Sequence, residues 1–401
     1  MFRALARQTG WVGVGIGGGQ GAILVATPFL ARIHGPAEFG ALALFLTASN
    51  IATALGCARY DVAIASAEQA LLAPLFRICA VLAIAFGTTC ILALLLMSAS
   101  LPASAILDKL HHNAGLLGAC MVMSALYQAE SALLLRQGRV RWLAALRVAQ
   151  GMGFALLGLT GHVSLIWAHT LSYLPAIALL CVISALQGPV NRRLMVETAR
   201  RYSDFPRFGL PGAVFDVIGY SLCIWVVIEV FGAISGGEWS QIQRVVGAPL
   251  MLCSIAVGQV LLVQSAQHRD NRRGLRRLFL QIELAMLALL VGIVAIMAIA
   301  GEDIFHLLLG EDWHVGAPFA ILVSIAVFIR AAVSPLSSIL VTFRRLDLGL
   351  RWQVTYFACA VITFAWVAHH ATLLQFAAFY ALHETILYLI YLRLIFGAMK
   401  D

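Results

Sequence analysis

Charged residues are scarce in this sequence. Only 11% of its 401 residues are Asp, Glu, Lys or Arg, whereas 61% are hydrophobic. A soluble domain carries about 25% charged residues, so the composition excludes an ordinary soluble protein. A membrane-spanning helix needs about 20 apolar residues, which leaves room for about a dozen helices in a chain of this length. The composition therefore predicts a protein that crosses a membrane many times.

The sequence also lacks the motifs of common catalytic and metal sites. Its eight cysteines form no CxxC pair, and its eleven histidines include no HExxH. We therefore expect no disulfide, no metal site and no bound cofactor. The stretch GVGIGG, 13–18, fits a dinucleotide-binding pattern by letters alone, but it lies in an apolar helix. We expect the pairs Gly15/Gly19 and Gly17/Gly21 to let a neighbouring helix approach closely instead.

Apolar stretches divide the chain into twelve predicted spans. Helices are the expected form, because lipid offers no water to the backbone polar groups of an open chain. One predicted linker, 187–208, separates two lobes of six spans each, 1–186 and 209–401. The predicted spans cover residues 10–31, 39–57, 72–98, 113–135, 143–160, 163–186, 209–231, 240–264, 278–300, 317–342, 352–368 and 373–396.

Basic residues gather on one side of this predicted arrangement. Loops on the other side hold only Arg32 and Lys109, together with an acidic group between 302 and 312. Positive charge marks the cytoplasmic side of a membrane protein, so we expect both termini in the cytoplasm. The net charge of +8 then reflects topology and contact with membrane lipids, and we expect no nucleic-acid partner.

The two predicted halves are weakly similar in sequence. The stretch LLLRQGRVRW in the first half parallels ILVTFRRLDLGLRW in the second, and Arg59 aligns with Gln259, two hundred residues later. Each half has an even number of predicted spans, so the repeats run parallel. Parallel repeats build transporters that alternate access around a site between two lobes.

Charged residues inside spans are the most informative, because each costs about 2.5–3.5 kcal/mol at a helix centre. Arg330 lies thirteen residues into the span 317–342, and neither Arg330 nor Arg244 has an acid one turn away. Their partner must come from another helix or from a substrate. A guanidinium binds phosphate through two hydrogen bonds, which suits an anionic substrate. We therefore predict substrate binding by Arg330 and Arg244, and also by Arg59 and its counterpart Gln259. In that role Asp61 would hold the side chain of Arg59; the alternative is that Arg59 and Asp61 form a solvated ion pair at a helix end.

The acids inside spans have two open interpretations. Glu130, Asp216 and Glu384 are either helix-to-helix pairs or protonated carboxyls, or they couple transport to protons or sodium ions. Three histidines, His34, His369 and His370, fall in predicted outer loops. We expect these three to be solvated.

An ordered set of stretches resembles the polysaccharide-biosynthesis flippases, the Wzx-type (O-antigen) translocases of the multidrug/oligosaccharidyl-lipid/polysaccharide (MOP) exporter superfamily. This family is related to the MurJ lipid flippases and the MATE drug exporters. The stretches are GPAEFGALAL (35–44), LGCARYDVAIA (55–65), LLLRQGRVRWLAALRVAQG (133–151), YSDFPRFGLPGAVFD (202–216), IQRVVGAPLMLCSIAVGQVLL (242–262), LRRLFLQ (275–281), GEDWHVGAPFAILV (310–323) and RAAVSPLSSILV (330–341).

The resemblance implies an all-α, V-shaped bundle of two lobes that flips an undecaprenyl-pyrophosphate-linked oligosaccharide between leaflets for surface polysaccharide. Basic residues of a central cavity would receive the pyrophosphate, and ion antiport would drive the cycle. Arg59, Arg244 and Arg330 fall in family-like stretches, and Asp216 ends another. The span 352–368 contains no acid that could partner Asp216, which favours protons over sodium. Other polysaccharide-assembly proteins are the expected protein partners.

Two alternatives stay open. A MATE-type multidrug exporter more often recognises cations, so acids should outnumber arginines in its cavity. A membrane polysaccharide polymerase or ligase usually needs a sizeable outer loop, and the longest here, 99–112 and 301–316, have about fifteen residues. We therefore expect a transporter and not an enzyme.

Overall fold

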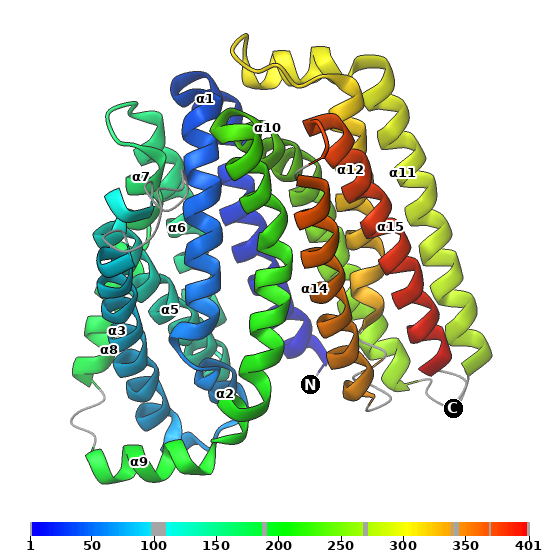
Figure 1. Ribbon diagram of the computed structural model, residues 1–401. Coiled ribbons are helices and arrows are strands. Elements are labelled where there is room, and N and C mark those ends of the chain that lie inside the picture. The colour runs from blue at the N-terminus through cyan, green and yellow to red at the C-terminus, as the bar shows by residue number, and fades with distance from the viewer. Residues whose placement is uncertain are drawn as a thin grey trace. The chain divides into compact units, whose positions relative to one another are not determined.

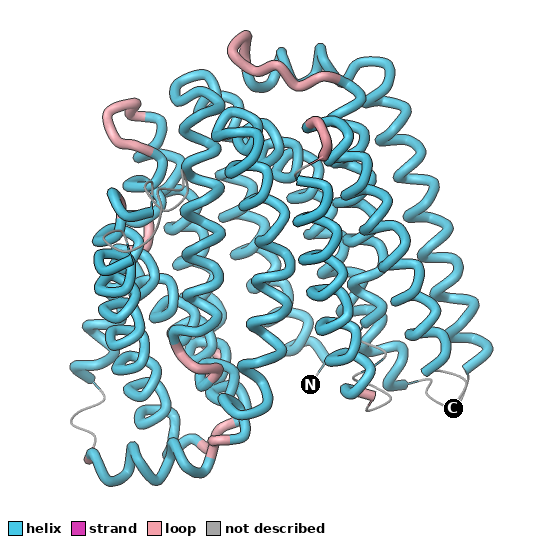
Figure 2. Tube along the Cα trace, viewed as in Figure 1, coloured by secondary structure: helices cyan, strands magenta, loops and turns pink. Residues whose placement is uncertain are grey.

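The computed structural model describes residues 2–97, 110–186, 191–267, 272–337, 340, 345–368 and 370–398. Helices fill almost all of these ranges, and no strand occurs in them (Figure 2). The all-α fold class is therefore confirmed. Contacts divide the chain into two units, Met1–Ser221 and Leu222–Asp401. The predicted lobe boundaries, with a linker over 187–208, stay a prediction.

Nine helices in the described ranges are long and apolar enough to cross a membrane. Two of them, Gly13–Gly56 and Leu210–Leu250, have 44 and 41 residues. Each is about twice the length that one crossing needs. The predicted total of twelve spans stays a prediction.

Unit 1 holds the helices before residue 222. They are α1 (Phe2–Gly56), α2 (Tyr60–Ser66), α3 (Leu72–Met97), α5 (Ala114–Arg136), α6 (Val140–Leu159), α7 (Leu165–Leu171), α8 (Leu174–Leu186) and α9 (Arg192–Arg201). A short π-helix, η2 (Phe205–Gly209), then leads into α10 (Leu210–Gln267), which continues into unit 2. The remaining long helices of unit 2 are α11 (Arg272–Leu309), α12 (Ala317–Val333), α14 (Leu346–Ala368) and α15 (Leu373–Ala398).

Two glycines break the longest helices. Gly35 in α1 has φ 68° and ψ 173°, and Gly232 in α10 has φ 90° and ψ 172°. Glycine reaches such angles at little cost because it has no Cβ. The break predicted over 32–38 therefore occurs, but as a sharp kink at Gly35 with helical residues on both sides and not as an open loop. Figure 1 shows α1 turning back on itself within unit 1.

The first helix packs closely on α6 through one of the two predicted glycine pairs. A Cβ on Gly15 would lie 2.6 Å from Ala144 Cα, and one on Gly19 would lie 2.5 Å from the Arg147 carbonyl oxygen. Any side chain at either position would force the helices apart, so this prediction is confirmed. Nothing lies within 4 Å of a Cβ placed on Gly17 or Gly21, and that pair does not serve helix packing within the described structure.

Candidate functional site

Three helices of unit 2 bring an arginine, a tyrosine and a glutamate together. Arg330 of α12 donates from Nη1 to the hydroxyl of Tyr356 on α14, at 3.4 Å. The same hydroxyl donates to Oε1 of Glu384 on α15, at 2.5 Å. Glu384 is 0% exposed. Two residues predicted for different roles, substrate binding and ion coupling, are therefore parts of one polar cluster.

Aromatic rings surround this arginine. Its Cζ lies 5.4 Å from the centroid of the Tyr356 ring and 5.9 Å from that of Tyr388. Trp352 stacks on Tyr391 with 4.4 Å between centroids and packs edge-on against Tyr388. Rings at these distances attract a guanidinium electrostatically. The partner that the sequence required of Arg330 thus includes neighbours on two other helices.

The sequence reasoning missed Tyr356 and Tyr388. A usable signal exists on α15, where Tyr380, Glu384 and Tyr388 recur every four residues and so lie on one helix face. All three are buried. A buried polar stripe inside a membrane helix should have pointed to an interhelical polar cluster.

Unit 1 contains a second buried glutamate with a different environment. Glu130 of α5 is 0% exposed, and neither of its carboxyl oxygens has a hydrogen-bond partner among the described residues. Tyr127, nearly one turn earlier, interacts electrostatically with Glu130 and with Arg147 of α6. Glu130 therefore stays a candidate for ion coupling by burial and chemistry.

Arg59 occupies a strained turn between α1 and α2. It has φ 65° and its neighbour Ala58 has φ 46°, and they alone among the described non-glycine residues have positive φ. Such conformations cost about 1–3 kcal/mol each and cluster at functional sites. The Arg59 side chain packs beside Gly209 of the π-helix, and its Nε is buried without a hydrogen-bond partner. The turn thus places the start of the Arg59 side chain beside the π-helix.

Asp61 does not anchor Arg59 by direct contact. No hydrogen bond or ion pair joins the two side chains in the described structure, although their charges do interact. Burial raises the pKa of the Asp61 carboxyl, and the charge of Arg59 opposes that rise. The predicted anchoring contact is therefore wrong, and the link between them is electrostatic.

The other predicted site residues lie on α10. Asp216 is exposed, whereas Arg244 is partly exposed with a buried Nη1. Beyond Arg244, Ser254 Oγ donates to the Ala331 carbonyl of α12 at 2.6 Å. The side chain of Gln259 lies outside the described residues, so its predicted role stays a prediction.

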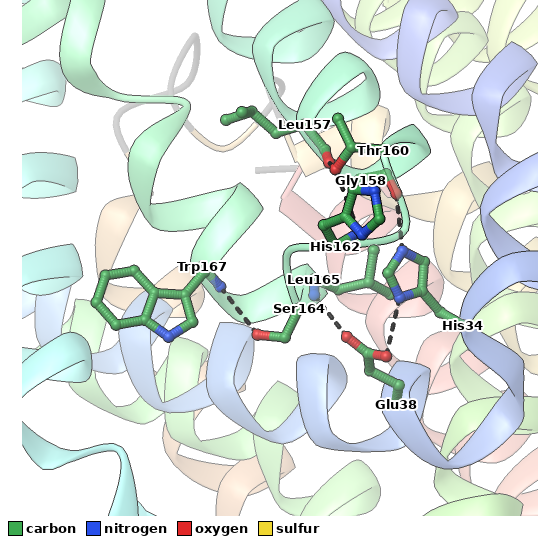
Figure 3. A network of polar contacts seen from close by, with 9 residues as sticks. All are labelled: His34, Glu38, Leu157, Gly158, Thr160, His162, Ser164, Leu165 and Trp167. Atoms are coloured by element: carbon green, nitrogen blue, oxygen red, sulfur yellow. Dashed lines mark hydrogen bonds and ion pairs between the residues drawn. The ribbon is translucent and has the colours of Figure 1, made fainter.

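A polar network at the kink of α1 links this helix to the end of α6 and the start of α7 (Figure 3). Glu38 accepts a hydrogen bond from the Leu165 amide at 2.6 Å and pairs with His34 Nδ1 at 2.9 Å. His34 Nε2 lies 2.8 Å from the Gly158 carbonyl oxygen. The His34 side chain is 4% exposed, so the expectation that it is solvated is wrong. His370 is exposed, as expected, and His369 lies outside the described residues.

Solved structures with this fold are membrane transporters. The lipid II flippase MurJ, in an inward closed conformation, aligns over 97% of this chain and 86% of its own, with a TM-score of 0.71 and 11% identity. An inward-facing MATE-family multidrug transporter aligns over 94% and 95%, with a TM-score of 0.63 and 15% identity. A MOP transporter from Pyrococcus furiosus covers 99% and 96%, at 0.51 and 14%. At such low identities, these structural similarities show that the chain shares the fold of these proteins and nothing more.

The family comparison is more specific than the structural one. No curated protein matches the chain. However, the family model described as polysaccharide biosynthesis protein matches residues 29–318, which is well over half of the chain. Together with the MOP fold, this match confirms the family expected from the sequence. The chain is thus a multi-pass membrane protein of the polysaccharide biosynthesis protein family, with the fold of MOP-superfamily transporters.

Proposed function

We propose that this protein is a flippase that moves an undecaprenyl-pyrophosphate-linked oligosaccharide from the cytoplasmic to the periplasmic leaflet of a bacterial inner membrane. The observation that carries the proposal is Arg330, a partly buried arginine inside the candidate membrane-spanning helix α12. The family supplies the link to polysaccharide, and the fold supplies transport. The arginine indicates that the substrate carries an anionic group.

The chemistry of such a substrate explains why a transporter is needed. The sugars are too polar to cross lipid, while the polyprenyl tail can stay in the bilayer. A guanidinium has five N–H donors in a fixed plane, so Arg330 can hold Tyr356 and still present donors to a pyrophosphate. Arg59, in the strained turn between α1 and α2, would contact the pyrophosphate at the cytoplasmic end of unit 1. Arg244 and Gln259 complete the proposed substrate-binding set.

Glu384 limits how this site can couple to protons. An ionised Glu384 and a bound pyrophosphate compete for the positive charge of Arg330, so this site favours binding of the anion together with a proton. An antiporter instead needs the proton and the substrate to bind in turn. Glu130, whose oxygens have no hydrogen-bond partner in the described structure, and the exposed Asp216 are therefore the stronger coupling candidates.

The main alternative is a drug exporter of the MATE kind. Such a protein would bind organic cations, which a buried arginine repels. A membrane polymerase or ligase is disfavoured by the fold, which the chain shares with transporters. We therefore assign no catalytic residue to this chain.

Genetic complementation tests the substrate assignment. Cells that lack their polysaccharide flippase should regain surface polysaccharide with the native chain and lose it with Arg330→Ala. Because Arg330→Ala leaves Glu384 buried beside no cation, the double variant Arg330→Gln/Glu384→Gln controls for stability. We expect the double variant to accumulate in the membrane and still produce no polysaccharide. Normal polysaccharide from either variant would contradict substrate binding by Arg330, and resistance to cationic dyes would favour the exporter.

Membrane vesicles test the coupling. Flipping of the lipid-linked oligosaccharide should fall when a protonophore collapses the proton gradient. It should also fall in Asp216→Asn and Glu130→Gln at unchanged protein levels. Flipping that ignores the protonophore would exclude proton coupling but leave the substrate assignment intact.

A further inference from the structure

Helix α9 is short, basic and amphipathic. Its sequence RRLMVETARR carries four arginines and one glutamate in ten residues. Figure 1 shows α9 lying crosswise at one end of unit 1, unlike the long helices beside it. A short helix in this orientation runs along a membrane surface and cannot cross it.

The contacts of α9 fix its depth. Arg201 forms an ion pair with Glu68. The candidate membrane span that contains most of α3 begins at the next residue, Gln69. Tyr60 Oη donates to the Ala199 carbonyl at 3.0 Å, and Met195 and Ala199 pack against the core of unit 1. These contacts hold α9 at the level where α3 enters the bilayer, which is the level of the lipid headgroups.

The surface left by this packing suits a lipid interface. Leu194 and Val196 lie on either side of the face of α9 that packs against unit 1, and they are 39% and 45% exposed. Arg192, Arg193 and Arg200 are exposed as well. Apolar side chains at headgroup depth contact acyl chains, while arginines reach outward to phosphates.

We propose that α9 is a binding surface for anionic phospholipid headgroups. The arginines contact the phosphates, and the flanking Leu194 and Val196 enter the acyl boundary on either side. Anionic lipids attract basic segments at a membrane surface by about 1 kcal/mol per arginine, or about fivefold in binding for each one. This inference requires only that the chain is a membrane protein, so it stands or falls separately from the proposed substrate.

Native mass spectrometry of the purified full-length chain tests the proposal. Phosphatidylglycerol is titrated against phosphatidylcholine, and the ratio of the two bound lipids is the readout. We expect the triple variant Arg192→Gln/Arg193→Gln/Arg200→Gln to reduce this ratio by at least tenfold while leaving phosphatidylcholine binding unchanged. Arg201 is kept, because its pair with Glu68 positions the helix.

The matched control removes three exposed arginines outside α9. The variant Arg139→Gln/Arg276→Gln/Arg351→Gln changes the net charge by the same amount and should keep the native ratio. An equal fall of the lipid ratio in both variants would show that net charge alone causes the effect, and would overturn the proposal. A native ratio in the α9 variant would also overturn it, and would point to a soluble acidic protein as the partner of this face.

Discussion

Two glutamates, Glu384 in unit 2 and Glu130 in unit 1, are equally buried but differ in their partners. Glu384 accepts a hydrogen bond from Tyr356, which in turn accepts one from Arg330. No described group donates to either oxygen of Glu130. Both side chains are 0% exposed. Burial alone therefore does not determine the role of a carboxyl in the membrane, because the neighbouring groups determine which of its protonation states is more stable.

The two units share one backbone feature, although their buried glutamates differ. Both units contain a helix that is kinked at a glycine with ψ near 170°, Gly35 in one and Gly232 in the other. This kink is therefore shared by the two units. The buried polar groups differ between the units. Glu384 is linked through Tyr356 to Arg330, whereas Glu130 makes no hydrogen bond in the described structure. The two units thus have the same kink geometry but differ in the charged groups that they bury.

Replacing each glutamate with leucine gives the largest expected contrast. Glu384→Leu should destabilise the protein by about 3–5 kcal/mol, because it removes the buried carboxyl that neutralises the partly buried Arg330. Glu130→Leu should be neutral or stabilising by about 1 kcal/mol, because it removes a buried polar group that makes no hydrogen bond. Denaturant unfolding in detergent micelles, followed by tryptophan fluorescence, measures both.

A double variant controls this comparison. Arg330→Met/Glu384→Leu replaces both charges with apolar groups and should recover most of the stability lost in Glu384→Leu. Equal losses in Glu384→Leu and Glu130→Leu would show that the two environments are energetically alike. That outcome would remove the basis for assigning them different roles.

The hydroxyl of Tyr356 offers a smaller contrast with that of Tyr60. Tyr356 donates to a carboxylate, whereas Tyr60 donates to the carbonyl of Ala199 at 3.0 Å. Hydrogen bonds to charged groups contribute about 1.5–3 kcal/mol and neutral ones about 1 kcal/mol. Tyr356→Phe should therefore lower the free energy of unfolding more than Tyr60→Phe, under the same unfolding conditions. The reverse order would contradict an ionised Glu384.

Sequence reasoning found the helices and two residues of the polar cluster in unit 2, because both depend on local composition. Apolar runs marked the spans, and the cost of charge in lipid singled out Arg330 and Glu384. The link between them was not predictable, because Tyr356 lies 26 residues from Arg330 and 28 from Glu384. Such contacts depend on how helices pack, which periodicity along one helix does not encode.

His34 shows the same limit at a helix break. The stretch IHGP, with glycine and proline together, is typical of a loop, and a loop histidine is usually solvated. In the structure Gly35 kinks a helix instead, and the kink turns His34 toward the Gly158 carbonyl. The local signal correctly marked a break, but the surroundings of the break came from residues more than a hundred positions away.

The smallest expected contrast lies between carboxylates that hold backbone amides in the two units. Glu38 accepts from the Leu165 amide at 2.6 Å and also pairs with His34. Glu238 accepts from the His314 amide at 3.3 Å. Because a carbonyl only accepts, His34 Nε2 carries a hydrogen toward Gly158, and one further proton lies between His34 Nδ1 and Glu38. Glu38→Gln therefore weakens a charge-assisted pair while keeping an acceptor for Leu165.

We expect Glu38→Gln to cost about 1 kcal/mol and Glu238→Gln a few tenths. Hydrogen exchange followed by mass spectrometry reads the effect locally, as faster exchange at the start of α7 in Glu38→Gln and near His314 in Glu238→Gln. His34→Gln is the matched control in unit 1, since it removes the pair but leaves Glu38 to accept from Leu165. If His34→Gln leaves exchange at α7 unchanged while Glu38→Gln raises it, the amide contact holds this end of unit 1 and the histidine does not. If both variants raise exchange equally, the histidine pair is what keeps Glu38 in place.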